Sequence, residues 1–187
     1  YFNFFIFLNV SPVFGASPDK NTKEIIANSE NFFEGKFRNI KTTYTNLRTL
    51  ERKSTLKEWF FPPEDKNPLG PLPTIKFKGQ DLTEGKFVWF GHSTLLMKTE
   101  GLVVMTDPVF NRASPLPSFS SKSKSSFFNG KPFVFENPIL IEDLPKVDVV
   151  IISHDHYDHL DSKAIKDLSN LVDHFIVPLG VGAHLER

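Results

Sequence analysis

The chain of 187 residues contains no cysteine. Thiolate metal ligands and disulfide bonds are therefore both excluded, and a metal ion would have to be bound by histidine and carboxylate side chains. The absence of cysteine fits oxidising and reducing compartments equally, so it does not indicate where the protein works.

Other features that the sequence lacks narrow the class of protein. Lys plus Arg and Asp plus Glu number 22 each, so the formal net charge is zero and no nucleic-acid partner is indicated. The sequence shows no internal repeats and no sign of a second domain. Its 40% hydrophobic and 24% charged residues are ordinary values for a soluble globular domain.

The apolar stretch at residues 1–10 is too short to span a bilayer comfortably. It is followed by small residues and prolines, as in the hydrophobic region and cleavage site of a secretory signal whose basic start is missing. We therefore expect residues 1–16 to be a signal peptide, cleaved near Gly15 or Ala16. The protein would then be exported, to a periplasmic, extracellular or membrane-associated location. An uncleaved membrane anchor and a mistranslated start are the alternatives.

The densest polar cluster comprises His154, Asp155, His156, Tyr157, Asp158 and His159. It directly follows the apolar run at residues 147–152, in which the continuous β-branched residues 149–152 predict a strand buried on both faces. Residues 163–168 show helical spacing after it, with Asp161 or Ser162 as the N-cap. The unit is predicted to be strand, loop and helix in an α/β fold, and such sheets place their ligands at the carboxyl ends of strands.

The residue types in this cluster favour a metal centre. Neutral imidazole and carboxylate suit zinc, manganese or iron, of which we expect zinc. His154 and His156 lie two residues apart, so in an extended segment they point the same way and can bind one ion. Asp158 and His159 follow a turn and can face a second ion, which would give a two-metal centre with a bridging hydroxide. The alternative is a solvated, turn-forming polar loop.

Several segments together resemble a known family. Residues 153–161 resemble the signature of the metallo-β-lactamase superfamily. Residues 89–94, 105–110, 112–115 and 177–182 resemble the N-acyl-phosphatidylethanolamine phospholipase D branch in order and approximate spacing. The resemblance implies an αββα sandwich with the metals at one edge, and hydrolysis of an ester or phosphodiester.

The resemblance also implies a division of the chain. Residues 74–187 would form the N-terminal part of the metallo-β-lactamase domain, preceded by a helical and wrapping segment with a linker at 17–73. In the family a further histidine, a bridging aspartate and a last histidine complete the metal sites from downstream segments. His174 and His184 do not match those segments, and we expect them on a strand and a helix. We therefore expect the first half of the sandwich, with weak metal binding and no useful turnover by these residues alone.

The function that the resemblance implies is metal-dependent hydrolysis of phospholipase D type. The substrate would be an N-acylated phosphatidylethanolamine, cleaved by a hydroxide that two metal ions activate, with Asp158 as the catalytic residue that orients the nucleophile. A lactonase or sugar-phosphate hydrolase of the same superfamily is an alternative, and a non-catalytic, metal-binding, membrane-associated protein is another. The sequence indicates a small-molecule or lipid substrate and contact with a membrane surface, but no substrate-binding residues and no oligomeric state.

Two residues outside the cluster are expected at the same edge of the sheet. Asp107 ends a predicted strand, and metal-bound histidines commonly donate their second N–H to a carboxylate, so we expect Asp107 to support the site. His92 lies between two predicted strands and is the weaker candidate for that supporting role. A strand-end turn for Asp107 and a buried, hydrogen-bonded side chain for His92 are the alternatives.

Overall fold

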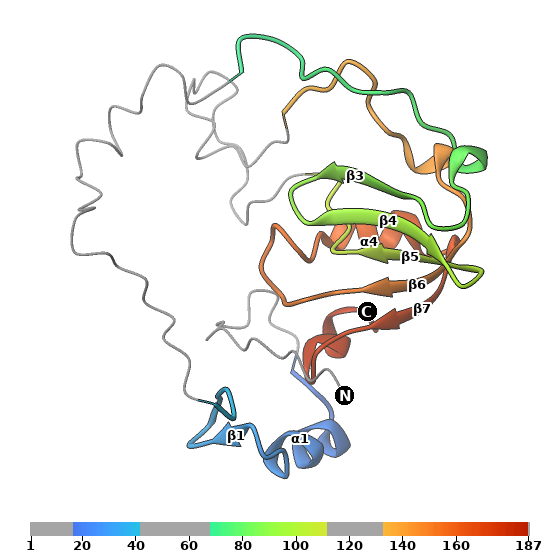
Figure 1. Cartoon of the computed structure of the whole chain (residues 1–187). Helices are drawn as coiled ribbons and strands as arrows, with labels where there is room; N and C mark the ends of the chain where they lie inside the picture. Colours follow the sequence, from blue (N-terminus) through green and yellow to red (C-terminus); the bar gives the residue numbers. More distant parts are fainter. Residues whose placement is uncertain (1–16, 42–67, 112–132, 187) are drawn as a thin grey trace, which may run out of the picture.

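The larger of the two sheets in the described residues has five strands (Figure 1). The computed structural model describes residues 17–41, 68–111 and 133–186. Within these ranges the strand order is β3-β4-β5-β6-β7. The strands are β3 (Phe87–Gly91), β4 (Thr94–Thr99), β5 (Leu102–Thr106), β6 (Val147–Ile151) and β7 (Val172–Ile176).

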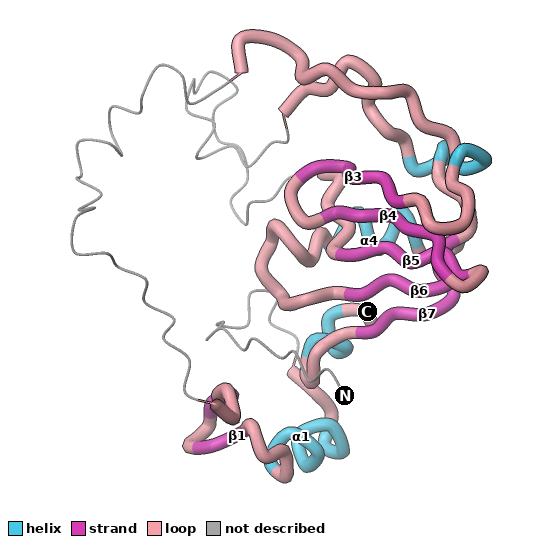
Figure 2. The backbone as a smooth tube through the Cα atoms, in the orientation of Figure 1, coloured by secondary structure: helices cyan, strands magenta, loops and turns pink. Residues whose placement is uncertain are grey.

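The sheet combines antiparallel and parallel pairing. Strands β3, β4 and β5 pair antiparallel, whereas β5 with β6 and β6 with β7 pair parallel. Parallel neighbours need a crossover connection, and between β6 and β7 this is the helix α4 (Ser162–Leu168), which lies against one face of the sheet (Figure 2). The expected α/β fold is confirmed.

The N-cap of helix α4 is Asp161, one of the two residues that the sequence predicted for this position. The Asp161 carboxylate accepts hydrogen bonds from the backbone N–H groups of Lys163 and Ala164 at 3.0 and 3.1 Å. Its other oxygen accepts the backbone N–H groups of Phe110 and Asn111 at 3.3 and 2.8 Å. The Asp161 side chain thus caps α4 and also binds the backbone of residues 110–111, which follow β5.

The core lies between the sheet and α4. Leu96, Met105 and Val150 occupy adjacent positions in neighbouring strands and are all 0% exposed. Alternation along strands places their sequence neighbours on the opposite face.

That opposite face is apolar and largely uncovered by the described residues. Trp89, Leu95, Thr106, Ile151 and Ile176 form one row across the five strands. Trp89 is 65% exposed, Ile151 38% and Ile176 56%. The expectation that β6 is buried on both faces therefore holds only in part: on the face opposite α4, Val147 is 0% exposed but Ile151 is 38% exposed. An apolar second face is what a sheet in the middle of a layered sandwich presents.

The N-terminal described segment contains the helix α1 (Lys20–Ala27) and a short hairpin. Asp19 caps α1 by accepting the backbone N–H of Thr22 at 2.6 Å. Strands β1 (Phe32–Phe33) and β2 (Lys36–Phe37) form the hairpin. Elsewhere in the described ranges the chain forms the 3-10 helices η2 (Gly79–Asp81), η3 (Ile141–Asp143) and η4 (Val181–His184).

None of the helices in the described ranges has the length and apolar character needed to cross a bilayer. The predicted signal peptide, residues 1–16, lies outside the described residues, as do residues 42–67 of the predicted wrapping segment. Both assignments stay predictions.

Candidate metal centre

Three segments bring polar side chains to one edge of the sheet. The parallel strands β5 and β6 end at the same edge, where Asp107 follows β5 and the loop 153–159 follows β6. The turn between β3 and β4, which carries His92, lies at that edge too because β4 and β5 are antiparallel. In Figure 1 this is the left edge of the sheet, where the chain leaves β6.

Asp107 is the anchor of the site. Its carboxylate, in a residue only 5% exposed, accepts hydrogen bonds from the backbone N–H of Ser153 at 2.7 Å, from the Ser153 hydroxyl at 2.8 Å and from His159 Nδ1 at 2.9 Å. Burial by itself would raise the pKa of Asp107, but the hydrogen bonds from His159 and Ser153 outweigh it and lower that pKa. The side chain is therefore an ionised acceptor.

The buried residue Thr94 fixes the backbone of Asp107. The hydroxyl of Thr94 donates to the carbonyl of Asp107 at 2.7 Å and accepts the backbone N–H of Val109 at 3.1 Å. Asp107 itself has a φ of 38°, a left-handed conformation that is uncommon for a residue other than glycine. Strand β4 thus holds the strained turn that aims Asp107 at the histidines.

The contacts of Asp107 determine the tautomers of two histidines. An ionised carboxylate only accepts, so His159 donates from Nδ1, and in the neutral imidazole Nε2 is then the nitrogen with the lone pair. Because the Ser153 hydroxyl donates to Asp107, its oxygen is left to accept from His154 Nδ1, which lies 2.9 Å away. His154 then also has an unprotonated Nε2. The lone pair at Nε2 is what a metal ion requires.

His154 and His156 meet as the sequence predicts. His154 Nε2 lies 2.9 Å from His156 Nδ1, and the ring centroids are 4.5 Å apart. Burial, followed by the proximity of His159 and His156, lowers the pKa of His154. The neutral form, which binds metal, is therefore favoured.

Asp158 and His159 form the other half of the cluster, together with His92. The Oδ2 atom of Asp158 lies 3.0 Å from His92 Nε2 and 3.7 Å from His159 Nε2. In the described part of the chain these residues form the one group of three whose ligand atoms all lie within 4.8 Å of one another. His92, the weaker sequence candidate, therefore lies at the site together with Asp158 and His159. In the sequence, only its position between two predicted strands indicated this.

The donor atoms fit a divalent transition metal. Imidazole nitrogens and a carboxylate oxygen converge without sulfur, a set that suits zinc and also manganese or iron. The His159 side chain is only 16% exposed, which distinguishes this loop from a freely solvated turn. His154, His156, Asp158 and His159 are thus brought together as expected, and their roles as ligands stay predictions. His174 lies in β7 and His184 ends η4, and neither belongs to the group of three.

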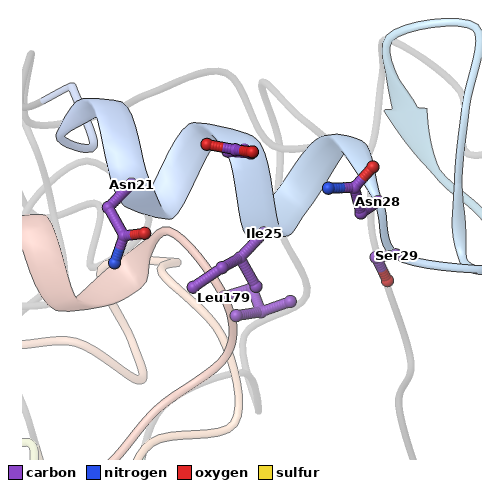
Figure 3. A pocket seen from close by; sticks show the side chains of 6 residues that line it. Asn21, Ile25, Asn28, Ser29 and Leu179 are labelled. Atoms are coloured by element: carbon purple, nitrogen blue, oxygen red, sulfur yellow. The ribbon is translucent and has the colours of Figure 1, made fainter.

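A separate shallow pocket lies beside α1. Figure 3 shows Ile25 of α1 and Leu179 pointing toward one another there, with Asn21, Asn28 and Ser29 around them. None of the histidines lines it. The candidate metal-binding side chains therefore lie at the sheet edge and not in this pocket.

Comparison with known proteins shows the family to which the chain belongs. Residues 86–183, more than half of the chain, match the model of the beta-lactamase superfamily domain. An uncharacterised protein of Mycobacterium tuberculosis is 36% identical over 84% of the chain and 41% of its own length.

Two relatives have names that state an activity. The N-acyl-phosphatidylethanolamine-hydrolyzing phospholipase D 1 of Caenorhabditis elegans is 36% identical over 73% of the chain and 37% of its own length. The mitochondrial enzyme with the corresponding name in Saccharomyces cerevisiae is 28% identical over 52% of the chain and 19% of its own length. The chain thus spans well under half the length of these relatives. With its motifs, its sheet and the match over residues 86–183, the chain belongs to the metallo-β-lactamase superfamily.

Proposed function

We propose that the protein is a metal-dependent hydrolase whose metal ions are held at the edge formed by β5, β6 and the β3–β4 turn. The observation that carries this proposal is the link from Asp107 to His159 and, through Ser153, to His154. These hydrogen bonds leave the Nε2 lone pairs of His154 and His159 available near the Asp158 carboxylate. Neutral, oriented imidazoles are what a metal centre needs and what a solvated loop does not maintain.

Each residue has a proposed role. His154 and His156 hold the first ion, and Asp158 and His159 hold the second. When bound, two divalent cations make hydroxide available near neutral pH and neutralise charge that develops on the substrate. The Asp158 carboxylate also accepts a hydrogen bond from the nucleophile and so orients it. Asp107 stays ionised and keeps His159 in the metal-binding tautomer.

The proposed substrate is an N-acylated phosphatidylethanolamine. The names of the Caenorhabditis elegans and Saccharomyces cerevisiae relatives support this choice, since both state hydrolysis of that lipid. In the proposed reaction water adds its oxygen to phosphorus and the bond from phosphorus to the ethanolamine oxygen breaks. The products are phosphatidic acid and an N-acylethanolamine, which carries away the proton.

The test uses the complete natural protein loaded with zinc. Vesicles containing N-acylated phosphatidylethanolamine are expected to yield both products, measured by mass spectrometry, and a panel of lactones is expected to stay intact. Asp158→Ala should abolish turnover, whereas the matched change Asp155→Ala in the same loop should retain most of it. Turnover of lactones alone would reassign the protein to the lactonases. Zinc binding without hydrolysis of any ester would make it a non-catalytic metal protein.

We also propose export, which the composition of residues 1–16 supports. Amino-terminal sequencing of the secreted protein is expected to show a new terminus near Gly15 or Ala16. A mature protein that still begins at Tyr1 would contradict cleavage.

A further inference from the structure

We propose that His92 is a positioning residue, which holds the Asp158 carboxylate in the orientation required at the second metal site. This inference rests on the proposed metal-dependent function and assigns a role to a residue outside the 154–159 cluster. It follows from three observations: the contact that His92 makes, the backbone conformation that presents it, and the side chains that hold that backbone.

The contact joins His92 to two of the proposed ligands of one ion. His92 Nε2 lies 3.0 Å from Asp158 Oδ2, and the rings of His92 and His159 are packed edge to face with centroids 5.1 Å apart. The side chains of His92 and Asp158 are 55% and 45% exposed. An exposed pair of this kind contributes little stability by itself, so its geometry has to be imposed by the backbone.

The backbone at His92 adopts a conformation that few residues accept. Its φ is 45°, and in the described ranges only Glu34, Glu100 and Asp107 share a positive φ among residues other than glycine. Glu34 and Glu100 each precede a glycine in a hairpin turn, where local geometry explains the value; His92 also lies in a hairpin turn, but it follows a glycine, Gly91, at a β-bulge. His92 and Asp107 instead both direct their side chains into the histidine cluster. Backbone strain that is retained at such a place points to a function.

Neighbouring side chains hold this turn in place. The Trp89 indole N–H donates to the carbonyl of His92 at 2.9 Å. Between them, Gly91 has a φ of 104°, and a Cβ atom there would lie 3.4 Å from the ring of Phe135. Trp89 is 65% exposed, but its indole N–H makes this hydrogen bond to the turn. The turn therefore holds His92 in a fixed position toward Asp158.

Holding Asp158 and binding the metal are mutually exclusive tasks for His92 Nε2. Donation to the carboxylate needs a proton on that nitrogen, whereas coordination needs its lone pair. The contact to Oδ2 is 3.0 Å, a hydrogen-bond distance, and an ionised carboxylate only accepts, so we infer that Nε2 is the donor. His92 therefore acts through Asp158.

Two substitutions separate these tasks. In His92→Gln the side-chain amide donates from about the position of Nε2, whereas His92→Leu has no donor; both residues carry the same backbone strain. Zinc affinity of the complete protein, measured by competition with a chromophoric chelator, is the readout. His92→Gln is expected to stay within about threefold of wild type, and His92→Leu to lose about 10–100-fold, the usual cost of losing such a supporting partner. Thermal unfolding of the metal-free variants checks that both fold.

Trp89→Phe extends the test to the turn. It keeps an aromatic ring and removes the bond to the His92 carbonyl, so zinc affinity should fall although no proposed ligand has changed. Because Trp89 acts through His92, the double variant with His92→Leu should bind zinc no more weakly than His92→Leu alone.

Each outcome decides the matter. Equal losses in His92→Gln and His92→Leu, or wild-type affinity in His92→Leu, would overturn the positioning role. A wild-type protein that binds no zinc would overturn both this role and the metal centre. If wild type binds zinc and the variants rank as expected but no phosphodiester is hydrolysed, the proposed function fails and the role of His92 stands.

Discussion

Replacing Asp107 by asparagine tests the tautomer argument directly. The substitution preserves shape and one acceptor oxygen but changes the other oxygen into an NH2 group. If the remaining oxygen keeps the 2.7 Å bond from the Ser153 backbone, the NH2 group faces the Ser153 hydroxyl and His159 Nδ1. The hydroxyl can reverse and accept. His159 Nδ1, however, can no longer donate at that position.

Two consequences follow, each with a magnitude. Loss of one hydrogen bond to a charged acceptor costs about 1.5–3 kcal/mol, so the metal-free variant should unfold with a free energy lower by about that amount. His159 regains a bond only by accepting at Nδ1, which moves its proton to Nε2, the nitrogen proposed to bind metal. Zinc affinity should therefore fall by about 10–100-fold.

Three measurements check these values. Urea unfolding gives the stability change, chelator competition gives the zinc affinity, and nitrogen NMR of the His159 ring reports which nitrogen carries the proton. Asp155→Asn is the matched control, since it makes the same charge change in the loop; it should alter zinc affinity by less than about threefold, well below the effect of losing a supporting partner. Wild-type zinc affinity in Asp107→Asn, with Nε2 of His159 still unprotonated, would refute the reasoning.

Three further predictions follow from the same contacts and burial. Ser153→Ala removes the link between Asp107 and His154, so stability should fall by about 0.5–1.5 kcal/mol and zinc affinity should fall less than in Asp107→Asn; Ser169→Ala, which removes a hydroxyl bond at the end of α4, is the control and should leave zinc affinity unchanged. Zinc at 100 times its dissociation constant should stabilise the protein by about 2.7 kcal/mol in thermal unfolding, reversibly on chelation; calcium should not, because it prefers oxygen ligands, and equal stabilisation by both would contradict a nitrogen-rich site. Met105→Ala, at a side chain that is 0% exposed, should lower the free energy of unfolding by about 2–5 kcal/mol, measured with urea. The control Leu102→Ala, at a side chain that is 48% exposed, should lower it by about 0.5 kcal/mol or less. Similar losses of stability in both variants would contradict the position of the core.

Local features of the fold were readable from the sequence. The run at residues 147–152 forms β6, and the helical spacing before Leu168 forms α4 behind its Asp161 cap. Such features depend on residues close in the chain, through strand alternation, helical period and capping. The burial of β6 was overestimated, because an apolar side chain does not reveal whether a layer covers it. Ile151 is apolar and yet 38% exposed.

By itself the sequence determined that a histidine- and aspartate-rich loop follows a strand, and that without cysteine any metal must bind to nitrogen and oxygen. The sequence also indicated Asp107 and His92 as candidates at the same edge, but only the tertiary structure decided which atoms of that loop they contact. Asp107 and Ser153 are 46 positions apart but lie in hydrogen-bond contact, because β5 and β6 run parallel and end together. His92 reaches Asp158 at 3.0 Å only through the register of the β3–β4 turn. Contacts of this kind depend on strand pairing across the sheet, which no local pattern in the chain encodes.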